Sequence, residues 1–124
     1  LHVIEPLSST AQSIVKTMMN DDSLMEMHDS SLDHLRDSLR ERIDRFCSSE
    51  LEPDEMPADD QIVARVEEGE PDQVILDIAD EIDADVIVMG TRKHNAVSQF
   101  LLGSTANKVM HRSQRPVLIV PLKK

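Results

Sequence analysis

The chain has 124 residues, 40% of them hydrophobic and 30% charged, which is the balance of a single globular domain. A net charge of −11 and only two aromatic residues argue against nucleic-acid binding, which uses basic surfaces and aromatic stacking. The single cysteine, Cys47, excludes an internal disulfide and fits a reducing cytoplasm, and no apolar run is long enough to cross a membrane. We therefore expect a cytoplasmic protein with no nucleic-acid or membrane partner.

The amino-terminal half predicts one strand and one helix. Leu1–Glu5 is an apolar run stopped by Pro6, which is typical of a buried strand. Residues 7–28 are rich in methionine but lack a clean apolar face, so we interpret them as an irregular, mobile connection with no more than a helical turn or two. A helix is predicted from Ser31, since apolar residues then recur with helical spacing, and an acidic loop over 48–60 follows it. The apolar stripe of that helix consists of Leu32, Leu35, Leu39, Ile43 and Phe46.

The middle of the chain predicts a strand, a helix and a second strand. Gln61–Glu67 carries the first of these strands, and Gly69 then turns the chain. Pro71 suits the first position of a helix that ends near Asp83. Asp85–Met89 is apolar on both faces, which favours a central strand of a parallel sheet.

The last third predicts a polar loop over 91–102, a helix from Ser104 to Ser113 and a strand at Val117–Val120. We expect Ser104 to cap this helix. The side chains expected to be buried on the helix are Ala106, Val109 and Met110. Strands and helices thus alternate along the chain, which predicts a parallel sheet with helices on both faces.

The charge distribution singles out the same third of the chain. Residues 91–124 contain no Asp or Glu, and glycines at 90 and 103 bracket the polar loop. A strand end, a loop and a helix start in this order can form a cradle for an anion such as phosphate. The alternative is that these cations pair with the acidic remainder of the chain. The seven basic residues are Arg92, Lys93, Lys108, Arg112, Arg115, Lys123 and Lys124.

The chain resembles the universal stress protein family over essentially its whole length. Nucleotide-binding members of that family carry Gly, two residues, Gly, nine residues, Gly, and then Ser or Thr. Here the pattern falls on Gly90, Lys93, Gly103 and Ser104, and the closing residues 116–121 resemble the family's last strand. The resemblance implies a three-layer, open parallel α/β fold of the adenine-nucleotide alpha-hydrolase kind. It implies one domain over residues 1–124 that lacks the family's first strand and helix.

The resemblance also implies a site for ATP or a related adenine nucleotide, with any Mg²⁺ held mainly by phosphate and water. The implied residues are Val3 on the adenine side, Met89 and Gly90 as the floor, Arg92 and Lys93 beside the phosphates, and Gly103, Ser104 and Thr105 as hydrogen-bond donors. Each has a purely structural interpretation too: Val3 and Met89 as core residues, and the glycine–serine pair as a turn and a helix cap.

Three functions follow from these patterns. The first is a homodimeric, ATP-binding regulatory protein of the stress response, and the second is a dimeric interaction module that binds no nucleotide because Lys93 replaces the family's second glycine. The third is a weak ATPase or phosphotransfer enzyme, which the lack of an acidic metal ligand in the loop disfavours. No catalytic set and no histidine or cysteine spacing typical of a metal site is visible. Family members pair through the last strand, which implies a dimer contact at Val117, Leu118, Ile119 and Val120.

Overall fold

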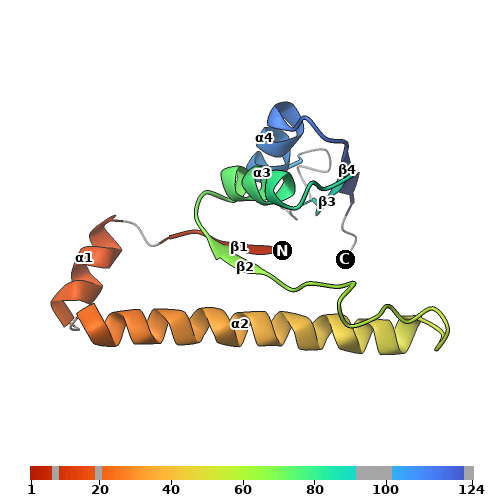
Figure 1. Ribbon diagram of the computed structural model, residues 1–124. Helices are drawn as coiled ribbons and strands as arrows, with labels where there is room; N and C mark the ends of the chain where they lie inside the picture. The colour runs from red at the N-terminus through yellow and green to blue at the C-terminus, as the bar shows by residue number, and fades with distance from the viewer. Residues whose placement is uncertain (7–8, 19–20, 92–101, 122–124) are drawn as a thin grey trace. The chain divides into compact units, whose positions relative to one another are not determined.

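The structure is a computed structural model that describes residues 1–6, 9–18, 21–91 and 102–121 (Figure 1). The chain forms two compact units, Leu1–Glu67 and Glu68–Lys124. Strands and helices alternate in part, in the order β1 (His2–Ile4), α1 (Ser9–Met18), α2 (Asp21–Glu50), β2 (Val66–Glu68), α3 (Pro71–Glu81), β3 (Ile87–Gly90), α4 (Ser104–Arg112) and β4 (Val117–Val120). In the described ranges, no helix is both long enough and apolar enough to cross a membrane.

The first unit contains a two-stranded sheet and two helices. Strands β1 and β2 pair with each other, and the His2 backbone N–H donates to the Arg65 carbonyl at 2.9 Å. The Arg40 guanidinium of α2 donates to the carbonyl oxygens of Ile62 and Asp59, the latter at 3.4 Å, and so ties the connection before β2 to the helix. Cys47, near the end of α2, is buried as a free thiol.

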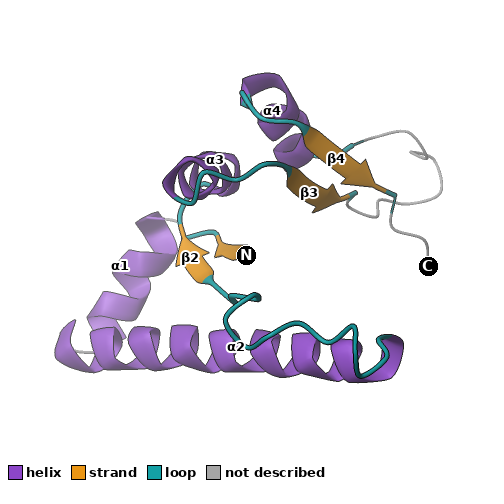
Figure 2. Ribbon diagram, turned by 45° about the vertical axis from the view of Figure 1, so that its right-hand side comes forward, coloured by secondary structure: helices purple, strands orange, loops and turns teal. Residues whose placement is uncertain are grey.

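The prediction of an irregular connection over residues 7–28 was wrong, because α1 and the start of α2 occupy most of it. Helix α2 begins at Asp21 and not at Ser31, and it runs for 30 residues without a break (Figure 2). The sequence has no glycine or proline between residues 7 and 52, so nothing interrupts helical propensity there. The predicted stripe is only partly covered, since Phe46 remains 62% exposed.

Strand β2 is shorter than the predicted strand over 61–67. It begins at Val66, and Val63 is 75% exposed. Within the part that was predicted as strand, the Ile62 carbonyl accepts from the Arg40 guanidinium and not from a neighbouring strand. The four predicted strands are all present, but the structure pairs them as two separate two-stranded sheets.

The second unit is built around the parallel pair β3 and β4. Their register runs from Ile87 opposite Val117 to Gly90 opposite Val120, which confirms the predicted parallel pairing. Helices α3 and α4 pack on one face of this pair, where Ile87 and Val109 are buried. The core is completed by Ile75, Leu76, Ala79, Ala84, Met89 and Val117.

Not every predicted core position of the second unit is buried. On the face of β3 and β4 away from the two helices, Val88, Leu118 and Val120 are exposed. Met110 was expected to be buried on α4, but it is 41% exposed because it turns away from the stripe of Ala106 and Val109.

Candidate functional site

The candidate cradle lies at the carboxyl edge of β3 and β4. The two strands end level with each other, and the Thr91 backbone N–H donates to the Val120 carbonyl at 3.1 Å. Helix α4 ends at Arg112, four residues before β4 begins, so its carboxyl end lies near the amino edge of the strands. Its amino end therefore points toward the carboxyl edge, where ligands of open α/β sheets bind.

The start of α4 has the backbone geometry of an anion-binding turn. Gly103 is the N-cap, with φ 84° and ψ 154°, a conformation that side chains disfavour, and its carbonyl accepts from the Asn107 N–H at 3.1 Å. The backbone N–H groups of Ser104 and Thr105 belong to the first turn, which has no acceptor within the helix. These two donors can therefore face a bound anion.

The prediction that Ser104 caps α4 was wrong by one residue. Gly103 occupies the cap position, no side-chain cap hydrogen bond is formed, and Ser104 is the first helical residue. The positive φ of Gly103 makes the chain enter the helix one position earlier than the sequence pattern indicates. The Ser104 hydroxyl consequently has no capping role in this structure.

The other predicted site residues are distributed over both units. Val3 lies half-buried in β1, in the first unit, whereas Met89 and Gly90 end β3 in the second. Met89 packs against the core beneath α3 and α4, in agreement with its interpretation as a core residue. Arg92 and Lys93 lie outside the described residues.

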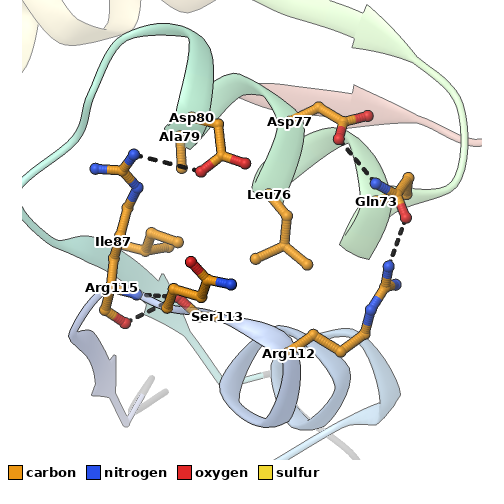
Figure 3. A pocket seen from close by; sticks show the side chains of 10 residues that line it. Gln73, Leu76, Asp77, Ala79, Asp80, Ile87, Arg112, Ser113 and Arg115 are labelled. Atoms are coloured by element: carbon orange, nitrogen blue, oxygen red, sulfur yellow. Dashed lines mark hydrogen bonds and ion pairs between the residues drawn. The ribbon is translucent and has the colours of Figure 1, made fainter.

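Two of the basic residues assigned to the cradle by the charge pattern lie elsewhere and pair with acids. The Arg112 guanidinium donates to the Asp72 carboxylate with one nitrogen and to the Gln73 amide oxygen with the other, each at 2.6 Å (Figure 3 shows the second bond). Asp72 and Gln73 belong to the first turn of α3, and Asp72 is only 7% exposed. For Arg112, the alternative of pairing within the chain is therefore the correct one.

Arg115 is the second paired cation, and it holds together the segments that lead into β3 and β4. Its Nη1 donates to the Ala84 carbonyl at 2.6 Å and to the Asp83 carboxylate at 3.1 Å, and its Nη2 donates to Asp80 at 3.3 Å. The hydrogen bond with Asp83 raises the pKa of the Arg115 guanidinium, outweighing the opposite effect of desolvation. This arginine therefore remains charged and fixed at the amino edge.

A cavity of about 210 Å³ opens between these two arginines, at the edge opposite the cradle (Figure 3). This volume is below the range of about 300–1,000 Å³ in which most small-molecule sites fall. Many of its polar groups already bind one another, as in the hydrogen bond from Gln73 to Asp77 at 2.8 Å. The cavity is lined by Gln73, Leu76, Asp77, Ala79, Asp80, Ile87, Arg112, Ser113, Gln114 and Arg115.

Sequence reasoning missed the pairing of Asp72 with Arg112. The two residues are 40 positions apart, and neither belongs to a motif. The available signal was weak: an acid in the first turn of one helix and a base in the last turn of another are each favoured by the helix dipole alone. Only the packing of α3 beside α4 makes them partners.

The whole sequence was then compared with known proteins. The model of the Universal stress protein family matches residues 1–121. The chain belongs to this family. The resemblance noted from its glycine spacing is thus confirmed, and with it a place among stress-response proteins.

Similar proteins come from archaea and bacteria. Universal stress protein MJ0577 of Methanocaldococcus jannaschii is 28% identical over 126 residues, which cover 99% of this chain and 75% of that protein. Stress response protein NhaX of Bacillus subtilis is 42% identical over 53 residues, which cover 43% of this chain and 32% of NhaX. The matched stretch thus spans about a third of NhaX.

The solved structure of MJ0577 shares the fold, with a TM-score of 0.58 at 22% sequence identity. The match covers 99% of this chain and 74% of that chain. It confirms the predicted open parallel α/β architecture.

Proposed function

We propose that this chain is a regulatory protein of the stress response that binds ATP or a related adenine nucleotide at the carboxyl edge of β3 and β4. The observation that carries the proposal is the start of α4. There a glycine with φ 84° precedes two first-turn N–H donors, at Ser104 and Thr105, and the strand before the loop ends in Gly90. These positions coincide with three of the four residues in the family's nucleotide-binding pattern.

Each part of the site would have one task. The N–H groups of Ser104 and Thr105 bind phosphate oxygens, and Gly90 lets the backbone approach them without a side chain. Arg92 and Lys93 add positive charge beside the phosphates. Mg²⁺, when it accompanies the nucleotide, is held by phosphate and water.

A dimeric interaction module without nucleotide is the second candidate, and two observations favour it. Lys93 stands where the family's nucleotide-binding pattern has a glycine. Arg112 and Arg115 are bound to acids at the opposite edge and add no charge to the cradle. Among the seven basic residues of this third of the chain, Arg112 and Arg115 are thus already neutralised by acids.

Both candidates include a homodimer through β4. The carbonyls of Pro116 and Val120 accept bonds from β3, so the alternate residues Val117 and Ile119 direct their N–H and C=O groups to the outer edge. An unpaired strand edge with such groups readily joins another strand. Antiparallel pairing of two β4 strands would satisfy the outer groups of Val117 and Ile119 in both copies.

Equilibrium dialysis with labelled ATP tests the proposal, with Lys93→Gly and Lys93→Gln as paired variants. We expect the unaltered chain to bind ATP, and both variants to bind it more weakly and with a flatter salt dependence because a phosphate-binding cation is lost. Glutamine keeps the bulk of the side chain, so it separates charge from crowding. No binding by the unaltered chain, with binding restored in Lys93→Gly alone, would establish the interaction module whose cradle the lysine obstructs.

A further inference from the structure

Helix α4 packs on α3 and β3 through one line of side chains, and Arg112 is the last residue of that line. Ala106 and Val109 are buried, the latter completely, and Arg112 follows with the same spacing of three residues. In the described part of the chain, Asp72, the partner of Arg112, is the charged residue that is buried. The line of contact thus ends in an ion pair between the buried Asp72 carboxylate and Arg112, whose side chain is 48% exposed.

The contacts of Arg112 are directional in a way that the apolar contacts are not. Its two terminal nitrogens bind two consecutive side chains of α3, those of Asp72 and Gln73, at 2.6 Å each. A guanidinium that forms two such bonds is fixed in orientation as well as in position. Packing of Ala106 and Val109 holds the helix on its neighbours, but apolar attraction is non-directional and does not by itself fix the direction of the helix axis.

We infer that Arg112 and Asp72 are positioning residues for the anion cradle at the other end of α4. This inference rests on the proposed function of that cradle. The nine helical residues form a rod of about 13 Å, so a tilt of about 10° at Arg112 displaces the opposite end by roughly 2 Å. A displacement of this size would misdirect the N–H groups of Ser104 and Thr105, because binding groups need a placement within about 0.5 Å.

Four variants separate positioning from simple stabilisation. Arg112→Gln removes the ion pair, and Arg115→Gln is the matched control, since Arg115 binds acids at the same edge but lies beyond the helix. The double variant Asp72→Leu with Arg112→Leu replaces the pair by apolar side chains, which often restores stability. Arg112→Lys keeps the charge without the planar fork, and it serves if the glutamine variant does not fold.

The measurements are ATP affinity by calorimetry, stability by urea denaturation, and the NMR amide shifts of Ser104 and Thr105. We expect Arg112→Gln to weaken ATP binding about tenfold and to move both amide shifts, and Arg112→Lys to have a smaller effect of the same kind. Arg115→Gln should change affinity by less than about twofold. The double leucine variant should regain stability but keep the weak affinity and the altered shifts.

Recovery of affinity together with stability in the double leucine variant would overturn the inference, as would unchanged Ser104 and Thr105 shifts in Arg112→Gln. If the unaltered chain binds no ATP, the proposed function is wrong. The amide shifts still decide the positioning role in that case, because they report the placement of the start of α4 without any ligand.

Discussion

Val109 of α4 and Ile87 of β3 are buried in one core, which attaches the helix to the strand that precedes the polar loop. Val109 has no exposed surface, whereas its neighbour Met110 is 41% exposed. The adjacent pair thus offers a direct comparison of a buried and an exposed position on one helix.

Val109→Ala should lower the free energy of unfolding by about 2 kcal/mol, because two buried carbons are lost and the space they leave is only partly refilled. Met110→Ala is the control and should cost less than about 1 kcal/mol. Urea denaturation of both variants measures the difference. Equal losses would show that α4 does not pack on β3 through Val109.

Gly103→Ala should destabilise the start of α4 by about 1–3 kcal/mol, because its backbone, at φ 84° and ψ 154°, is in a region that is essentially restricted to glycine. The same change should weaken ATP binding, since the first turn supplies the proposed phosphate donors. Chemical denaturation and calorimetry with ATP check the two effects.

Ser104→Ala is the matched control for Gly103→Ala. Ser104 is the first helical residue and makes no capping bond, so its hydroxyl should contribute under about 0.5 kcal/mol to stability. A loss near 1 kcal/mol, the usual value for removing a serine cap, would instead place the N-cap at Ser104.

Leu118→Glu should weaken the proposed homodimer several-fold, because antiparallel pairing of two β4 strands brings the two carboxylates close to each other across the two-fold axis. Val88→Glu places the same charge on the same exposed face, but on β3, away from the outer edge of β4. Sedimentation velocity over a range of protein concentrations compares them. An equal effect of both substitutions would argue against pairing through β4.

The boundaries of helices and strands were predicted correctly where prolines mark them. Prolines at 116 and 121 bracket β4, and both ends of that strand were predicted correctly. Pro71 likewise marked the first residue of α3. Between residues 7 and 52 there is neither proline nor glycine, and there the boundaries of α1 and α2 were not found.

The sequence predicted only part of the candidate site, for a related reason. The glycines at 90 and 103 marked the end of β3 and the start of α4, between which the proposed cradle lies, but a cap position depends on a φ value that composition does not reveal. The charge pattern assigned Arg112 and Arg115 to the cradle, since a count of cations contains no information on where their partners lie. Both arginines pair with acids at least 32 residues away, contacts that only tertiary packing creates.

Among the described residues, the core formed by α3, β3, α4 and β4 consists of side chains between Ile75 and Val117. These contacts join residues at most 42 positions apart, whereas His2 of β1 pairs with Arg65, 63 positions away, so forming the core of the second unit loses less chain entropy. The carboxyl-terminal third should therefore acquire its native packing early, before the strands of the first unit come together. Refolding followed by hydrogen exchange would then show amides of α3 and α4 protected ahead of those in β1.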